Sequence, residues 1–168
     1  TGSGCIAIAL AKELPAAKVS ACDISPAALT IARRNAARLG FAERIEFQEC
    51  DLLSAFVPPA SSATRVLFDL IVSNPPYIGR REEEALAREV REHEPELALF
   101  GGEEGYELYG PLIAQAQQLL KPSGLLVLEL GHDSLPAVQP LLETPQWTNV
   151  GVTKDLAGIP RVICAEKI

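Results

Sequence analysis

Residues 67–77 read LFDLIVSNPPY and join an apolar run to a rigid polar loop. The run predicts a strand that ends where the loop begins. The two prolines fix φ and remove two backbone donors, so no local helix can occupy the carbonyls of Asn74 and Pro75, which stay available as acceptors. Asn74 adds a side-chain oxygen, and Tyr77 supplies a flat apolar face. We therefore interpret the loop as a holder for a planar NH2 group, with a strand-ending turn as the alternative.

Length and composition predict one globular domain over residues 1–168. The chain is 48% hydrophobic and 22% charged, which is enough to bury a substantial core. No apolar run approaches the roughly 18 residues that span a bilayer, so a membrane role is unsupported. The formal net charge of -7 argues against a surface built mainly to hold nucleic-acid phosphates, and it favours protein or small-molecule partners.

The four cysteines indicate a reducing compartment. Cys5, Cys22, Cys50 and Cys164 show no CxxC spacing and lie in apolar surroundings. This pattern favours reduced core thiols over disulfides or a zinc site. We therefore expect a cytoplasmic protein that is monomeric and holds no metal.

The chain begins with a glycine-rich turn, Thr1-Gly2-Ser3-Gly4, and contains no methionine. A turn of this kind normally connects a buried strand to the helix that follows it. We therefore expect that a first strand, and whatever precedes it, lies outside these 168 residues.

The periodicity of the apolar residues predicts alternating strands and helices. One helix has an N-cap, Ser25, before a proline at its first position, and Gly40 stops it. The charged residues 80–94 predict a solvated helix face, with a binding role as the alternative. The prolines and serines of residues 58–62 predict a loop, and residues 121–124 are expected to end a helix. Helices are expected over 5–14, 26–39, 108–120 and 134–142, and strands over 19–23, 45–49, 67–72, 125–130, 148–153 and 161–165.

This order predicts an α/β fold. We expect a doubly wound, mostly parallel, Rossmann-like sheet with helices on both faces and an antiparallel hairpin at its C-terminal edge. In such sheets a ligand lies at the carboxyl ends of the strands, at the switch point. Four features fall at those ends: the turn of residues 1–4, Asp23, Asp51 and the loop of residues 74–77.

Each of these features suits a nucleoside ligand. The glycines let the backbone approach a ligand closely and place amides at a helix start. The Asp23 carboxylate can accept hydrogen bonds from two ribose hydroxyls, and the Asp51 carboxylate from an adenine amino group. A helix cap or a loop anchor is the alternative role for each acid.

With these features the chain resembles the class I S-adenosylmethionine-dependent methyltransferases, and within them the glutamine-N5 methyltransferases that act on peptide chain release factors. The resemblance covers essentially all 168 residues. Asn-Pro-Pro-Tyr alone is shared with enzymes that methylate amino groups of DNA and RNA. Two other segments are similar to the release-factor branch: residues 94–109, with Gly101, Gly102 and Gly105, and the tail at residues 155–162.

The resemblance implies S-adenosyl-L-methionine as the cofactor. It implies cofactor contacts from Thr1, Gly2, Ser3, Gly4, Asp23, Asp51, Leu52 and Asn74. In this arrangement Gly2 and Gly4 line the methionine and ribose side, and Asp23 holds the ribose hydroxyls. Asp51 and Leu52 flank the adenine.

The resemblance also implies the substrate, which is the glutamine side chain in the Gly-Gly-Gln motif of a release factor. Its amide site consists of Asn74, Pro75, Pro76 and Tyr77, and Asn74 contacts cofactor and substrate alike. The family's preceding strand and its N-terminal helical domain, which helps to grip the release factor, are missing from this sequence.

Amide chemistry explains the need for these acceptors. An amide lone pair is delocalised into its carbonyl and is a poor nucleophile. Acceptors on Asn74 and Pro75 receive hydrogen bonds from both N–H groups of the amide and aim its nitrogen at the methyl carbon. They also stabilise the positive charge that grows in the transition state. No strong general base is needed, because the product can lose its proton late, to water.

Other candidate residues have alternative interpretations. His93 and His132 lack a triad or metal-ligand partner in the sequence and are expected to be surface or structural residues. Tyr77 is interpreted as a substrate wall, with a packed core ring as the alternative. For Glu129, which ends an apolar strand, a solvated strand end and a role in orienting the loops both stay open.

Three other function classes compete with this interpretation. An amino-methyltransferase acting on adenine or guanine of nucleic acid needs a similar pair of acceptors and a stacking face, but the acidic charge balance opposes it. A dinucleotide-binding oxidoreductase would need a full GxGxxG and would leave residues 74–77 unexplained. A non-enzymatic interaction module would keep the fold without turnover.

Overall fold

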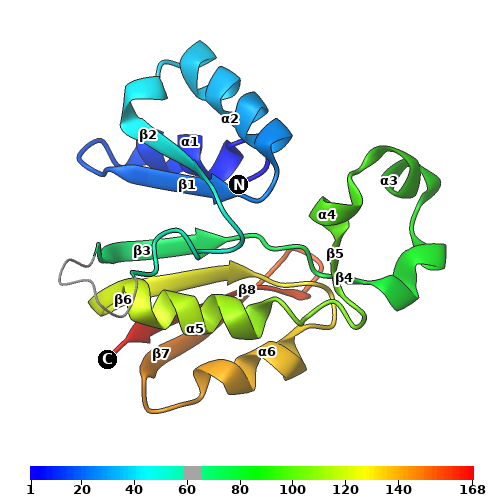
Figure 1. Ribbon diagram of the computed structural model, residues 1–168. Helices are drawn as coiled ribbons and strands as arrows, with labels where there is room; N and C mark the ends of the chain where they lie inside the picture. Colours follow the sequence, from blue (N-terminus) through cyan, green and yellow to red (C-terminus); the bar gives the residue numbers. More distant parts are fainter. Residues whose placement is uncertain (59–65) are drawn as a thin grey trace. The chain divides into compact units, whose positions relative to one another are not determined.

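The computed structural model describes residues 1–58 and 66–168 (Figure 1). These residues form two compact units, Thr1–Thr64 and Arg65–Ile168. The prolines and serines expected to form a loop lie outside the described residues from position 59 on. The expectation of one domain over residues 1–168 stays a prediction, and each unit is described by itself.

The first unit packs two helices against a pair of parallel strands. Its elements are α1 (Cys5–Glu13), β1 (Val19–Asp23), α2 (Pro26–Arg38), the short 3-10 helix η1 (Ala42–Arg44) and β2 (Ile45–Glu49). β1 and β2 pair in register from Val19 with Ile45 to Asp23 with Glu49. The buried core joins Ala7, Ala11, Ala21, Ala36 and Ile45, so small residues bring the helices close to the strands.

Local capping explains the limits of α2. The Ser25 hydroxyl accepts a hydrogen bond from the Ala28 amide at 3.2 Å, and Pro26 occupies the first turn. At the other end Gly40 has φ 81°, and the Phe41 amide donates to the Ala36 carbonyl at 2.8 Å. The predicted start and stop of this helix are confirmed to within one residue.

The second unit is built on a mixed four-stranded sheet in the order β3-β6-β8-β7. β3 (Phe68–Ser73) and β6 (Leu120–Glu129) are parallel, whereas β8 (Pro160–Lys167) is antiparallel to both β6 and β7 (Trp147–Lys154). The predicted antiparallel terminal hairpin is therefore confirmed. Its second strand, β8, lies inside the sheet, and β7 forms the edge (Figure 1).

Two helices and the strand β6 contribute buried residues to the core of this unit. α5 (Tyr109–Leu119) and α6 (Leu135–Leu142) bury Leu112, Leu119 and Val138, and β6 contributes Leu126 and Leu128. Leu125, between Gly124 and Leu126 on β6, is exposed, as strand alternation requires. These buried residues hold β6 and its carboxyl end in place.

The structure differs from the sequence prediction at the start of β6. Residues 121–124, expected only to end a helix, form an irregular segment inside this strand, because Leu120 already pairs with Phe68 while the next pair is Leu70 with Leu125. Ser123 has φ 61° within this bulge.

The segment between β3 and α5 contains elements that the sequence prediction missed. β4 (Ile78–Gly79) and β5 (Phe100–Gly102) form a short parallel pair, and α4 (Glu96–Leu99) precedes β5. The charged residues 80–94 form η2 (Arg80–Ala85) and α3 (Arg88–His93) in place of one helix face. Neither piece buries a residue, so no tertiary packing supports a longer helix.

Two expectations drawn from the composition concern membrane spans and the burial of the cysteines. None of the helices that the structure describes has the length and apolar character needed to cross a lipid bilayer. Cys5 is exposed at the start of α1, so the expectation of a core thiol is wrong at this position, while Cys22, Cys50 and Cys164 are partly buried.

We predict that Leu142→Ala lowers the free energy of unfolding of the second unit by about 2–5 kcal/mol, because it removes a packed side chain and leaves a cavity. Leu142 is 1% exposed, whereas its neighbour Leu141 in the same helix is 39% exposed, which makes Leu141→Ala the matched control. Urea unfolding followed by Trp147 fluorescence measures both. Equal losses in the two variants would contradict the packing assigned to α6.

Candidate functional site

The glycine-rich turn of residues 1–4 leads directly into α1. Gly2 has φ 54° and Gly4 has φ 82°, both in the region that favours glycine. The Gly4 amide donates to the Thr1 carbonyl at 3.0 Å, which closes the turn. A Cβ on Gly4 would lie 3.1 Å from the Cβ of Ala32, so the turn also packs closely on α2. Thr1, Gly2 and Ser3 stay exposed.

The carboxylate of Asp23 joins this turn to the start of α2. One oxygen, Oδ2, accepts a hydrogen bond from the Gly2 amide at 2.8 Å, and the other, Oδ1, accepts one from the Ser25 amide at 2.8 Å. Burial raises the pKa of Asp23, but the hydrogen bonds that the carboxylate accepts, first those from the Gly2 and Ser25 amides, outweigh burial and hold the pKa below its ordinary value of 3.8. The carboxylate is therefore ionised at neutral pH and retains lone pairs for further donors.

A pair of thiols supports the segment after β2, a feature that the sequence analysis missed. Cys22 and Cys50 both donate to the carbonyl of Leu52, with Sγ–O distances of 3.0 and 3.4 Å. Leu52 has φ 49°, a conformation that is unfavourable for a branched side chain and is held here by the two contacts. Burial and the neighbouring Cys50 raise the pKa of Cys22 to about 12, so its thiol remains protonated and can donate. Asp51 is exposed beside them.

The first unit therefore brings together one half of the predicted site. The turn, Asp23, Asp51 and Leu52 all follow the carboxyl ends of β1 and β2 or contact them. Strand pairing accounts for this, because the Cys50 amide donates to the Asp23 carbonyl at 3.1 Å and extends the β1–β2 ladder by one residue.

The other half of the predicted site lies in the second unit, in the loop that follows β3. Asn74 is exposed, Pro75 is buried, and Pro76 and Tyr77 are partly buried. The loop runs from the end of β3 into β4, so strands on both sides limit its movement. The side-chain amide of Asn74 is thus presented at the surface beside a proline that is packed inside.

The Tyr77 ring is held by the carboxyl end of β6. Its hydroxyl donates to Oε1 of Glu129 at 3.4 Å, and the buried Tyr109 of α5 donates to the carbonyl of Glu129 at 2.7 Å. Burial, followed by the negative charge of Glu129, raises the pKa of Tyr77 above 10, against an opposing effect of Arg161. Of the two interpretations left open for Glu129, this contact favours the orienting role.

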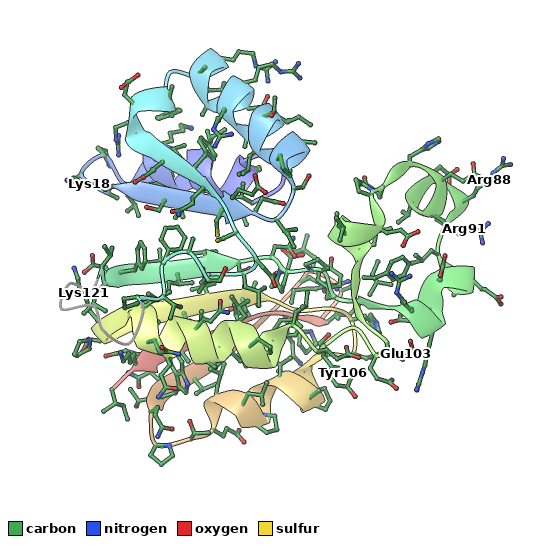
Figure 2. All side chains as sticks on the ribbon, viewed as in Figure 1. Lys18, Arg88, Arg91, Glu103, Tyr106 and Lys121 are labelled. Carbon is green, nitrogen blue, oxygen red and sulfur yellow. The ribbon has the colours of Figure 1, made fainter. Side chains whose placement is uncertain are left out.

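A pocket of about 380 Å³ lies beside Tyr77 in the same unit. Tyr106, which is labelled in Figure 2 on the segment between β5 and α5, contributes a second aromatic ring. His132 is exposed and lies 2.9 Å from Oδ1 of Asp133, in agreement with a surface role. The residues lining the pocket are Tyr77, Ile78, Glu82, Glu104, Tyr106, His132, Asp133, Ser134 and Arg161.

Sequence analysis singled out only Tyr77 as a site residue in this lining. The others come from five separate stretches of the chain, and no spacing between them signals a common site. Arg161 was quoted only as part of the tail pattern. Its guanidinium donates to Asp155 at 3.2 Å and to the Leu130 carbonyl at 3.3 Å, which holds the turn between β7 and β8 against β6.

Comparison with known proteins points to one enzyme family. A family model described as a methyltransferase domain matches residues 1–151. A release factor glutamine methyltransferase of Koribacter versatilis is 47% identical over 167 residues, which are 99% of this chain and 56% of that protein. One from Bradyrhizobium diazoefficiens is 44% identical over 169 residues, 100% of this chain and 54% of that protein. The chain spans about half the length of these curated relatives.

Solved structures show the same fold. The crystal structure of TrmN from Thermus thermophilus has a TM-score of 0.69 and 26% identity, covering 100% of this chain and 42% of that one. The ribosomal protein L11 methylase from Lactobacillus delbrueckii subsp. bulgaricus has a TM-score of 0.67 and 24% identity, covering 100% and 67%. The α/β methyltransferase-like fold with a mixed sheet is therefore established.

We predict that Asp23→Asn lowers the free energy of unfolding at neutral pH but not in strong acid. Because the folded-state pKa lies below 3.8, the stabilisation by the Asp23 carboxylate is fully present above about pH 4 and disappears as the pH falls through the folded-state pKa. Urea unfolding between pH 7 and pH 2 measures the difference. Glu49→Gln, an exposed change opposite Asp23 in the strand register, is the control. An Asp23→Asn profile parallel to that of the unmodified chain at every pH would count against this assignment.

Proposed function

This chain belongs to the family of methyltransferase domains, and on that premise we propose that it methylates the side-chain amide nitrogen of a glutamine in a peptide chain release factor. S-adenosyl-L-methionine is the methyl donor, and the glutamine is that of the Gly-Gly-Gln motif. The observation that carries the proposal is the loop of residues 74–77, with an exposed amide, a packed proline and an aromatic ring held by Glu129. The names of the relatives support the choice of substrate.

The residues of the first unit fit the proposed cofactor. An ionised carboxylate at a strand end, tied by amides but with lone pairs remaining, is suited to accept hydrogen bonds from ribose hydroxyls. No atom lies within 4 Å of the place where a Cβ on Gly2 would stand, so the turn leaves room on its outer side. Asp51 and Leu52 would flank the adenine, and Thr1, Ser3 and Gly4 would complete the turn around the methionine part.

The chemistry can be derived from the residues of the second unit. When bound, S-adenosyl-L-methionine supplies a methyl group on a positively charged sulfur. The side-chain oxygen of Asn74 and the carbonyl of Pro75 accept hydrogen bonds from the two N–H groups of the glutamine amide. These hydrogen bonds point the amide nitrogen toward the methyl group. They also stabilise the positive charge that develops on the nitrogen as the new bond forms. Pro76 keeps the loop rigid, the Tyr77 ring covers the amide face, and the proton leaves late, to water.

The proposed function agrees with a particular type of fold. We propose a doubly wound, mostly parallel, Rossmann-like sheet as the fold of the whole chain, in which ligands bind at the carboxyl ends of the strands. The parallel pairing of β1 with β2 and of β3 with β6 supports this arrangement. One methyltransferase domain over residues 1–168, acting as a cytoplasmic monomer, completes the proposal.

We predict that the protein at its natural length transfers labelled methyl groups to a release factor, but not to a version in which the glutamine of the Gly-Gly-Gln loop is alanine. Asn74→Ala should lower kcat by roughly 100- to 1,000-fold, as does the loss of one group that stabilises transition-state charge. Gln118→Ala, which removes an exposed carboxamide on α5, is the matched control and should leave kcat unchanged.

Other outcomes would identify a different function. Label on DNA or RNA but none on the release factor would overturn the proposal in favour of a nucleic-acid amino-methyltransferase. Cofactor binding without transfer to either substrate class would favour a non-enzymatic module.

A further inference from the structure

We infer that three glycines position the loop of residues 74–77 for the reaction. They are Gly101, Gly105 and Gly131, called the glycine clasp below, and they contact the main chain of Pro76 and Tyr77. The inference rests on the proposed function, because it assigns the clasp a role in setting the acceptors that hold the substrate amide. Gly101 and Gly105 belong to the sequence pattern at residues 94–109, for which the sequence analysis had no physical role.

Strand pairing brings the clasp to the loop. β4 begins directly after Tyr77 and pairs with β5, Ile78 opposite Phe100 and Gly79 opposite Gly102. The guanidinium of Arg80 lies 4.8 Å from the centre of the Phe100 ring and 3.3 Å from Oε2 of Glu96. These contacts keep the segment that carries Gly101 and Gly105 beside the loop.

The approach of this segment leaves no space for a side chain. A Cβ on Gly101 would stand 2.3 Å from the Pro76 carbonyl oxygen, and one on Gly105 would stand 2.5 Å from the Tyr77 carbonyl oxygen. Distances under 3.0 Å are essentially never seen for real Cβ atoms, and here the obstructing atoms are main chain, which cannot swing away. Any larger residue must therefore shift main chain at this contact, and the main chain that faces it belongs largely to residues 76–79.

The third glycine acts from the carboxyl end of β6. A Cβ on Gly131 would stand 3.1 Å from both Cδ2 and the carbonyl oxygen of Tyr77, and 2.7 Å from the Ser134 hydroxyl. Two residues earlier, Glu129 accepts the Tyr77 hydroxyl. The main chain of residues 76 and 77 is thus approached by β5 and the segment after it, and the ring and carbonyl of Tyr77 are approached by the segment after β6. The positions of Asn74 and Pro75, joined to them directly, follow from these contacts.

Another glycine offers a control for backbone strain. Gly105 has φ 92° and Gly40, in the first unit, has φ 81°, but a Cβ on Gly40 would meet no atom within 4 Å. An alanine has a strained backbone conformation at both positions. Only at Gly105 does its Cβ also collide with main-chain atoms beside the loop. Comparing the two variants separates displacement of the loop from general destabilisation.

We predict that Gly105→Ala, in the protein at its natural length, lowers kcat for the release factor by about 100-fold, the scale expected for misplacing a reacting group by about 1 Å. The dissociation constant of S-adenosylmethionine should change much less than kcat, because all the proposed cofactor contacts except Asn74 lie in residues 1–52. Gly40→Ala should keep kcat while losing a similar amount of stability. Steady-state kinetics, cofactor titration and urea midpoints measure these. Equal kcat values for the folded Gly105→Ala and Gly40→Ala proteins would overturn the inference.

A second readout does not depend on turnover. Hydrogen exchange of the Tyr77, Ile78 and Gly79 amides should be faster in Gly105→Ala and unchanged in Gly40→Ala, even if the unmodified protein methylates no release factor and the proposed function fails. Unchanged exchange in Gly105→Ala would show that the loop is not held by the clasp. If Gly105→Ala does not fold, Gly131→Ala takes its place, since its nearest obstruction is the Ser134 side chain, and the same faster exchange is expected.

Discussion

β6 is hydrogen-bonded along both edges, to β3 on one side and to β8 on the other, and this pairing organises the second unit. The same strand carries Leu126 and Leu128 into the core and ends at Glu129, where the Tyr77 and Tyr109 hydroxyls converge. A continuous chain of contacts therefore runs from the buried core to the loop of residues 74–77. The rigidity of a central strand reaches the candidate site through the side chains of Glu129 and Tyr77.

In the first unit a single carboxylate has a comparable role. Asp23 accepts hydrogen bonds from the glycine turn and from the N-cap of α2, so the segments that precede α1 and α2 share one anchor. Its lowered pKa keeps the charge in place across the physiological range. Both halves of the candidate site are thus built in the same way, from a polar side chain at the end of a parallel strand that receives donors from neighbouring loops.

Much of the candidate site was predictable because its signals are local. Ser25 and Gly40 mark the limits of α2 through interactions within a few residues, and Asp23 and Asp51 follow strands whose apolar patterns are clear. Tyr77, Ser134 and Arg161 lie far apart in the chain and line one pocket only because β4, α6 and β8 follow or contain them in the folded unit. The Cys22 and Cys50 contact on Leu52 was missed for the same reason, since it depends on the register of β1 and β2.

Local signals in the sequence were enough to predict the alternation of strands and helices, the capping of α2 and the residue types of the two loops on which the resemblance rests. Tertiary structure alone decided that β8 lies inside the sheet, that residues 80–94 break into two short helices, and that Gly101 and Gly105 pack on Pro76 and Tyr77. The physical reason is the range of the forces involved. Helix caps and periodicity act over a few residues, whereas strand order and close main-chain contacts depend on segments that meet only when the chain has folded.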